Sequence, residues 1–412
     1  MANIITNPTI IDDLINRRIN EAIPGKDDLL KRLLSGERLT IYQGFDPTSP
    51  NLHIGHLVGI LTLKKFQELG HKVIFLIGDF TATIGDPTGK DKTRTALTFE
   101  QVRNNAQTYQ DQIQSVLHFD GANPAALRFN SEWLKQMDLT EVLELAMGFT
   151  AQQMLERDMF QRRLQEEKPI GLHEFLYPVL VTKDALAMNV DIELGGSDQL
   201  FNMSVGRNVI KSLTGKDKMA ITTHLLVDNT GKKIGKTEGN AINISDKPED
   251  LYGKIMSLSD EAIMPCFKLI TLVPTEELVE IEKAASQNPM QQKKRLAWEI
   301  VAMLQGKSKA DKAQEHFEKT VQSGEIPQEM PTIRMEKVAN IFLKKIDNLA
   351  VEIPDLLVRT HMTPSKSEAR RLIEQGAVRV DGEVVKDLKT EVTLKPGMII
   401  QAGKRKFIKI TD

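Results

Sequence analysis

Two histidines in the first quarter of the chain are spaced so that they could act on one phosphate group. His53 and His56 stand three residues apart in the string GFDPTSPNLHIGH, residues 44–56. A strand should end near residue 45, and a helix should begin near His53, which places both imidazoles on one face of its first turn. Backbone N–H groups at a helix start bind anions, and glycine lets a nucleotide come close. The imidazoles could therefore donate hydrogen bonds to phosphate charge that grows in a transition state, although a bare HxxH pair is more often a surface or metal-binding coincidence.

Two lysines with the same spacing follow roughly 180 residues later. Lys233 and Lys236 lie in GKKIGKTEGN, residues 231–240, which reads as a glycine-containing loop. Point charges on flexible stems suit a mobile clamp that follows pyrophosphate as it leaves. A lone KxxK would more often be a solvated basic loop.

A third group of polar residues could choose an organic substrate. Tyr42 ends the strand that leads into the histidine turn, and Tyr177 and Asp184 share one face of a helical segment two turns apart. The string LGGSDQ, residues 194–199, follows a short strand at the sheet edge where ligands of parallel sheets bind. A buried aspartate beside a tyrosine hydroxyl would accept a phenol and reject its deoxy analogue. Taken singly, each of these residues is more simply a satisfied, partly buried polar group.

The composition is that of a globular protein with more than one domain. The chain has 412 residues, of which 41% are hydrophobic and 27% charged, so two or three domains are expected. The net charge of −2 means that a nucleic acid would have to meet a local basic patch. Cys266 is the only cysteine, which excludes a disulfide framework and fits a reducing cytoplasm. Residues 1–18 read as an amphipathic helix and not a signal peptide, and no apolar run approaches the roughly 20 residues that span a bilayer.

Alternating short apolar runs and helical patterns in the first half predict an α/β fold with a doubly wound, Rossmann-like parallel sheet. Strands are expected over residues 39–45, 72–78, 189–193 and 219–227, with a helix over residues 57–69. Residues 139–165 favour an inserted helical hairpin, and residues 247–320 are almost wholly helical in pattern.

The end of the chain has a different charge. Residues 357–412 carry 12 Lys and Arg against 7 Asp and Glu, a net charge of +5. Residues 357–382 predict a helix–turn–helix, followed by short strands, and the cations Lys366, Arg370, Arg371, Lys404 and Arg405 are candidates for binding RNA phosphates. The alternative is a merely solvated basic tail.

The two short strings together resemble the signatures of class I aminoacyl-tRNA synthetases. Residues 53–56 match the first signature, HIGH, letter for letter, and residues 233–237 stand where the second, usually KMSKS, is expected. From about residue 10 to the C-terminus the chain resembles bacterial tyrosyl-tRNA synthetases. The basic module resembles a small RNA-binding fold first named from a ribosomal small-subunit protein.

This resemblance implies the activation of tyrosine by ATP, accompanied by Mg²⁺, and transfer of the tyrosyl group to the 3′ end of the tRNA for tyrosine. It also implies a cytoplasmic homodimer joined through the inserted helices, with no structural metal. The implied catalytic residues are Thr48, His53, His56, Lys233 and Lys236. Those implied to bind tyrosine are Tyr42, Asp46, Asp86, Tyr177, Asp184 and Gln199. Those implied to bind ATP are Gly44, Thr48, His53, Gly55, His56, Gly196, Asp198, Lys233, Lys236 and Thr237, and Thr81 and Arg94 match positions that approach substrate or phosphate.

The resemblance also implies a division into four parts. Residues 1–240 form the Rossmann-like catalytic domain, with the dimerisation insert near 120–170. Residues 241–335 form an α-helical domain on the anticodon side, residues 336–350 a linker and residues 351–412 the RNA-binding module. The chain departs from its relatives at Val181, where many have a glutamine that helps to bind the substrate ammonium.

Two other interpretations remain open at this point. A tryptophanyl-tRNA synthetase or a small adenylate-forming ligase would share the nucleotide signatures, but the phenol pair and the basic module argue against both. An RNA-binding protein that has lost catalysis would keep the fold, but the intact histidines and lysines argue against it.

Overall fold

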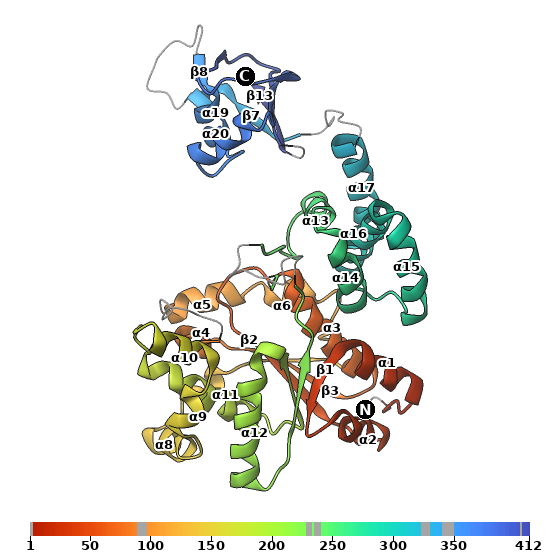
Figure 1. Cartoon of the computed structure of the whole chain (residues 1–412), viewed down its shortest axis with the longest axis vertical. Helices are drawn as coiled ribbons and strands as arrows, with labels where there is room; N and C mark the ends of the chain where they lie inside the picture. The colour runs from red at the N-terminus through yellow and green to blue at the C-terminus, as the bar shows by residue number, and fades with distance from the viewer. Residues whose placement is uncertain are drawn as a thin grey trace. The chain divides into compact units, whose positions relative to one another are not determined.

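The computed structural model describes residues 3–88, 97–227, 233–234, 240–322, 330–339, 350–403 and 406–412 (Figure 1). The chain divides into two units, Met1–Ala310 and Asp311–Asp412. In the described part of the chain, no helix is both long and apolar enough to cross a membrane.

A six-stranded sheet forms the centre of the first unit, in the order β1-β6-β5-β2-β3-β4. Its strands are β1 (Ile19–Ile23), β2 (Thr40–Phe45), β3 (Lys72–Ile77), β4 (Ala126–Phe129), β5 (Ile192–Gly196) and β6 (Met219–Thr223). All neighbours are parallel except the edge strand β1, which runs antiparallel to β6. The predicted doubly wound α/β fold is therefore confirmed.

Burial explains why the inner strands are apolar runs. Five of the six residues of β3 are buried, as expected for a parallel strand covered on both faces. Helix α3 (Ile54–Glu68) packs on β2 and β3 on one side and on α14 (Ile263–Ile270) on the other, which accounts for apolar residues around most of its circumference.

The remaining helices of this unit surround the sheet and extend into a helical region. They are α1 (Pro8–Arg18), α2 (Lys26–Leu34), α4 (Thr81–Ile84), α5 (Phe99–Ala106), α6 (Tyr109–Ile113), α7 (Ser131–Leu134), α8 (Leu139–Ala146), α9 (Ala151–Leu155), α10 (Asp158–Gln165), α11 (Leu176–Ala187), α12 (Leu200–Thr214), α13 (Pro248–Met256), α15 (Thr275–Gln287) and α16 (Pro289–Gln305). Short 3₁₀ turns cover Leu172–Phe175, Ser197–Gln199 and Asp260–Ala262. Helix α17 (Lys307–Phe317), continued by a π-helical turn over Glu318–Gln322, spans the division between the units.

The insert is not the helical hairpin expected from the sequence. It consists of the three short helices α8, α9 and α10, drawn in yellow in Figure 1. Thr150 interrupts the pattern because its side chain accepts the backbone N–H of Gln153 and starts α9. Gly148 lies so close to α12 that a Cβ atom there would stand 2.8 Å from Val209.

Two buried arginines of α1 bind the carboxyl end of α14. Arg17 donates to the carbonyl oxygens of Phe267 (3.1 Å) and Lys268 (2.7 Å), and Arg18 donates to that of Leu269 (3.0 Å). These carbonyls lie in the last turn of α14, where the helix dipole favours positive charge. Arg18 donates further to the Thr271 carbonyl at 3.1 Å, so α1 holds the end of α14 in place.

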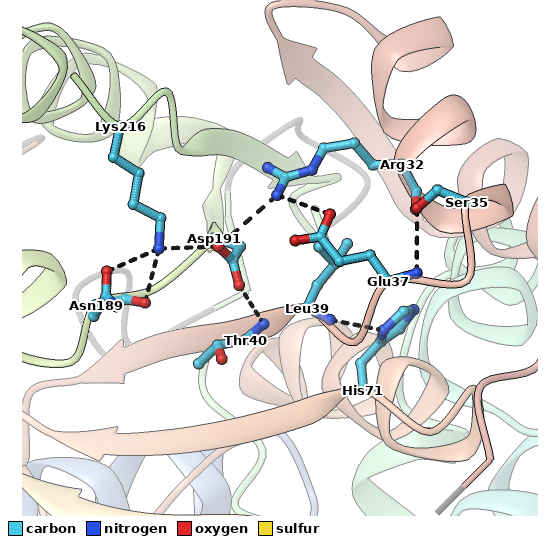
Figure 2. Close-up of polar contacts among 9 residues, drawn as sticks. All are labelled: Arg32, Ser35, Glu37, Leu39, Thr40, His71, Asn189, Asp191 and Lys216. Atoms are coloured by element: carbon cyan, nitrogen blue, oxygen red, sulfur yellow. Dashed lines mark hydrogen bonds and ion pairs between the residues drawn. The ribbon is translucent and has the colours of Figure 1, made fainter.

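A polar cluster joins the amino ends of the parallel strands (Figure 2). Asp191, just before β5, accepts the backbone N–H of Thr40 at 2.8 Å and contacts the ammonium of Lys216 at 2.9 Å. His71, just before β3, accepts the backbone N–H of Leu39 at 3.3 Å. The cluster sets where three strands begin and leaves the opposite edge of the sheet to the functional side chains.

The second unit is a small α+β fold. Its five-stranded sheet has the order β10-β9-β12-β13-β7, and β8 pairs with β11. The elements are β7 (Thr332–Arg334), α18 (Met335–Ala339), β8 (Ala350–Glu352), α19 (Ile353–Arg359), α20 (Lys366–Glu374), β9 (Val378–Val380), β10 (Glu383–Val384), β11 (Glu391–Thr393), β12 (Ile399–Ala402) and β13 (Lys406–Thr411). Helices α19 and α20 are the predicted helix–turn–helix, and they share one apolar core with the strands.

Candidate active site

Candidate site residues gather at the carboxyl ends of the parallel strands. Tyr42 lies in β2, and Asp46 follows that strand directly. Thr81 begins α4 after β3, Asn130 follows β4, and Gly196 ends β5. In open α/β sheets this edge forms the crevice where ligands bind.

The two signature histidines lie at the start of α3 with their rings in contact. His53 is the N-cap of the helix, and the ring centroids of His53 and His56 are 3.8 Å apart. The Nδ1 atom of His56 accepts the backbone N–H of His53 at 3.0 Å, so the neutral ring carries its proton on Nε2. Burial lowers the pKa of His53 to about 4, and burial with the neighbouring His53 lowers the pKa of His56 well below its usual range. Both imidazoles are therefore neutral donors near pH 7.

The described part of the lysine loop touches this helix start. A Cβ atom on Gly55 would stand 2.8 Å from the backbone oxygen of Ile234, so only glycine allows this approach. The Lys233 ammonium contributes to the lowered pKa of both histidines and lies 2.6 Å from an Asp198 carboxylate oxygen. Lys233 thus lies near both histidines and in contact with Asp198. Lys236, Thr237 and Arg94 lie outside the described residues.

Tyr42 does not bond to Asp184 but to a neighbour in the sheet. Its hydroxyl donates to the Oε1 atom of Glu193 at 2.7 Å, and both side chains are buried. The other oxygen of Glu193 forms an ion pair with Lys218, which is also buried. Burial raises the pKa of Tyr42 well above its usual range, with the charge of Asp184 adding to the effect.

Asp184 projects from α11 and is held by two donors. Trp133 donates its indole N–H to one carboxylate oxygen at 2.7 Å, and Asn130 donates to the other at 3.1 Å. Burial nevertheless raises the pKa of Asp184 to about 8, because these hydrogen bonds only partly offset the desolvation of its charge.

Asp46 joins three of the strand ends. One of its oxygens accepts the hydroxyl of Tyr177 at 2.9 Å, and the other accepts that of Thr81 at 2.8 Å. Thr81 in turn accepts an amide N–H of Asn130 at 2.9 Å. A Cβ atom on Gly78 would stand 2.0 Å from the Asp46 carboxylate, so glycine is required there.

Asp86 forms a second acidic centre nearby. Gln199 donates to one of its oxygens at 2.6 Å, and Thr88 donates its backbone N–H (3.0 Å) and hydroxyl (2.7 Å) to the other. Arg157, at the start of α10, donates to the Thr88 hydroxyl at 2.6 Å and stacks over Phe201. The insert therefore helps to hold the Asp86 carboxylate in position.

Val181 stands on α11, one turn after Tyr177, and is half-buried. Its neighbour Thr182 donates its hydroxyl to the Pro178 carbonyl at 2.8 Å and packs against Gly206 of α12. Thr182 therefore faces α12 and does not replace the missing glutamine.

The remaining nucleotide candidates line the same edge. The backbone N–H of Thr48 donates to the Asp46 carbonyl at 2.7 Å, which closes the turn after β2. A Cβ atom on Gly196 would stand 2.5 Å from an Asp198 oxygen, whereas one on Gly44 would meet only the Leu76 side chain at 3.8 Å. A side chain at position 196 would therefore displace the Asp198 carboxylate, whereas one at position 44 would displace no atom of the protein.

In the second unit, three candidate cations stand together on α20. Lys366, Arg370 and Arg371 are exposed. Lys366 forms an ion pair with Asp355, and Arg371 lies 3.8 Å from Glu368. Lys404 and Arg405 lie outside the described residues.

Sequence reasoning missed several of these side chains. Asn130 could have been found, because a polar residue directly after a parallel strand lies at the ligand edge. Glu193 could also have been found from the pairing of its strand with that of Tyr42. Lys218 carried no such signal, because the string GKDK reads as an exposed charged turn. Among the described residues, no group of three or more His, Cys, Asp and Glu side chains could hold a metal ion.

Comparison with known proteins places this geometry in a family. Residues 34–322 match the model of class I tRNA synthetases (W and Y), and residues 353–400 match the S4 domain. A tyrosine–tRNA ligase of Moorella thermoacetica is 42% identical over 404 residues, which cover 96% of this chain and 94% of the relative. One of Thermotoga maritima is 41% identical, covering 97% and 96%.

Solved structures show the same fold. A truncated mitochondrial tyrosyl-tRNA synthetase of Coccidioides posadasii superposes with a TM-score of 0.62 at 26% identity, covering 74% of this chain and 91% of that one. A tyrosyl-tRNA synthetase of Archaeoglobus fulgidus complexed with L-tyrosine superposes with a TM-score of 0.59 at 22% identity, covering 75% and 99%. The chain therefore belongs to the class I aminoacyl-tRNA synthetases and, among them, to the tyrosyl-tRNA synthetases.

Proposed function

We propose that the side chains at the carboxyl edge of the sheet carry out the first of two reaction steps. As a tyrosyl-tRNA synthetase, the chain activates tyrosine with ATP to tyrosyl-adenylate and pyrophosphate, and then transfers tyrosine to its tRNA. The carboxylate of tyrosine attacks the α-phosphate in line, which needs no covalent enzyme nucleophile. Catalysis then depends on positioning and on electrostatic stabilisation.

The observation that carries this proposal is the meeting of the two signatures at one helix start. Lys233 and the pair His53 and His56 approach the same space from segments far apart in sequence. Because both imidazoles are neutral, they act as hydrogen-bond donors to the growing phosphate charge and carry no positive charge of their own. Lys233 and Lys236 supply the positive charge, and they follow the pyrophosphate as it leaves. We assign Gly44, Thr48, Gly55, Gly196, Asp198 and Thr237 to the rest of the ATP site.

The substrate tyrosine has a recognition group at each end. We assign its phenol to Tyr42 and Asp184. Its ammonium goes to the acidic end of the pocket, which is formed by Asp46, Asp86, Tyr177 and Gln199. The carboxylates of Asp46 and Asp86 attract the ammonium, and the hydrogen bonds of Tyr177 and Gln199 to them keep both carboxylates in place.

We infer that magnesium arrives with ATP and neutralises part of its phosphate charge. Magnesium in nucleotide sites is held largely by phosphate oxygens and water, with one or two carboxylates at most. The Asp198 carboxylate lies 2.6 Å from the Lys233 ammonium, beside the assigned phosphate site.

The second step needs a surface for the tRNA, and we assign part of it to α20. Its cations Lys366, Arg370 and Arg371 belong to the S4 module and can meet RNA phosphates. Replacing all three by alanine in the full chain should leave ATP–pyrophosphate exchange unchanged and weaken tRNA binding. The slope of log affinity against log salt should also fall, by about one for each RNA phosphate that is no longer neutralised.

A matched control removes the same charge from elsewhere in the unit. Lys386, Lys389 and Lys395 are exposed outside α20, and alanine at these three positions should change charging less. Equal effects of the two triple variants, or a loss of exchange in the first, would overturn the assignment of α20.

We also propose a homodimer that buries one face of α8. Leu139, Leu143 and Met147 are spaced four residues apart and are 72%, 57% and 78% exposed, which leaves an apolar stripe uncovered. Leu143→Glu should give monomers in sedimentation equilibrium, whereas Leu213→Glu, at a 55% exposed leucine on α12, should not. A monomeric parent protein, or a Leu143→Glu dimer, would exclude this interface.

The four-part division at residues 240, 335 and 350 and the cytoplasmic location both stay predictions. A catalytic domain that ends near residue 240 would include every assigned tyrosine and ATP residue.

A further inference from the structure

The Tyr42 hydroxyl has a fixed partner inside the sheet. Tyr42 pairs with Glu193 in the register of β2 and β5, and paired residues of parallel strands project to the same face. Their side chains meet at 2.7 Å, with 2% and 4% of their surfaces exposed. Water therefore has little access to this hydrogen bond.

The second oxygen of Glu193 determines the direction of that bond. It forms an ion pair with Lys218, which lies just before β6 and is 1% exposed. Burial lowers the pKa of Lys218 to about 7, and the carboxylate in contact with it favours the charged form. The proton that Glu193 and Lys218 share is either on the Lys218 nitrogen or on Oε2 of Glu193. In both cases the Oε1 atom that faces Tyr42 carries no proton and remains an acceptor.

We propose that Glu193 and Lys218 are specificity-determining residues because they hold the Tyr42 proton away from the substrate. The Tyr42 oxygen then offers only lone pairs to the pocket, and it accepts the phenolic O–H of the substrate. Glu193 and Lys218 are positioning residues that act through Tyr42. This inference rests on the assignment of Tyr42 to the phenol end of the site.

The arrangement selects substrates that carry a donor on the ring. Phenylalanine and 4-fluorophenylalanine have no such donor, so either would leave the buried Tyr42 oxygen unpaired. Asp184 lies at the same end of the site, where Trp133 and Asn130 donate one hydrogen bond to each of its oxygens and leave a second lone pair on each.

Glu193→Gln keeps the shape and reverses the hydrogen bond. The glutamine oxygen will turn toward the Lys218 ammonium, so its NH₂ group faces Tyr42 and donates to it. The Tyr42 proton is then released toward the pocket, where it can bond to Asp184 when no phenol is present. We expect a preference for tyrosine over phenylalanine and 4-fluorophenylalanine that is at least tenfold smaller, with kcat for tyrosine within a few-fold of the parent value.

The measurement is kcat/KM in ATP–pyrophosphate exchange for L-tyrosine, L-phenylalanine and 4-fluoro-L-phenylalanine. Glu174→Gln is the matched control, because Glu174 pairs with Arg163 in the same unit and both are also buried. It should lower thermal stability as Glu193→Gln does, but leave the substrate ratios unchanged. If Glu193→Gln does not fold, the double variant Glu193→Met/Lys218→Met removes both polar groups, so the Tyr42 hydroxyl has no acceptor in the sheet and the ratios should also fall.

Substrate ratios that stay within twofold of the parent values in the variants that fold would overturn the inference, as would an equal change in Glu174→Gln. A parent protein without tyrosine-dependent exchange would instead contradict the assigned site itself. The two failures are therefore distinguishable.

Discussion

Replacing His56 with alanine removes two interactions of different kinds. The Nδ1 atom of His56 accepts the backbone N–H of His53, which caps α3, and its Nε2–H is the donor that we assign to the phosphate. Loss of a cap costs about 1 kcal/mol of stability. Loss of a preorganised donor to transition-state charge costs about 2–4 kcal/mol, which is roughly 30- to 1,000-fold in rate.

ATP–pyrophosphate exchange separates these two effects. His56→Ala should lower kcat by that factor and leave KM for tyrosine nearly unchanged, because the donor acts only when charge develops. His53→Ala should give a smaller loss of the same kind. His71→Ala is the matched control, since His71 is also a buried imidazole whose Nδ1 accepts a backbone N–H, but at the opposite edge of the sheet. It should lose stability and retain kcat. A His56→Ala enzyme with normal kcat, or with KM raised as much as kcat falls, would refute the reasoning.

Three further predictions follow from single contacts. Val181→Gln should lower KM for tyrosine by about tenfold or more in exchange kinetics, because one hydrogen bond to a charged group contributes about 1.5–3 kcal/mol, and an unchanged or higher KM would contradict the assigned ammonium site. Asp191→Ala should lower the free energy of unfolding by about 2–3 kcal/mol in denaturant titrations, because the Thr40 N–H loses its acceptor and Lys216 loses an ion pair, and exchange kinetics should not change. Burial lowers the pKa of both His53 and His71 from 6.5 to about 4, so the unfolded chain binds more protons between these values. The contribution of each histidine to the free energy of unfolding should therefore be fully present above pH 6.5 and be lost as the pH drops toward 4, by up to about 3 kcal/mol, and His71→Gln should reduce that dependence in urea titrations at pH 5 and 7.5.

The parts of the fold that follow a local pattern could be predicted from the sequence. The apolar run over β3, and the proline-rich turn between β2 and α3, each have a signature within a dozen residues. The insert was predicted less well, because helix formers run through residues 139–165 and hide the cap at Thr150 that starts a new helix. Close packing of Gly148 on α12 is a tertiary contact, which no local pattern reveals.

The candidate site divides in the same way. The strings around His53 and Lys233 could be recognised as parts of the site from the sequence, because the types and spacing of their residues suit the binding of phosphate groups. The partners behind the pocket depend on the order of strands, which the sequence does not state. Glu193 reaches Tyr42 only because β5 lies beside β2, and Lys218 reaches Glu193 only because β6 lies beside β5.

The central claim is that this sheet edge activates tyrosine and distinguishes it by its phenol. The most direct measurement is ATP–pyrophosphate exchange by the full chain with each of tyrosine, tryptophan and phenylalanine, followed by charging of tRNA with the amino acid that supports exchange. We expect rapid exchange with tyrosine, exchange with tryptophan and phenylalanine lower by orders of magnitude, and charging with tyrosine. Exchange with tryptophan as fast as with tyrosine, or no exchange with any of the three, would contradict the account.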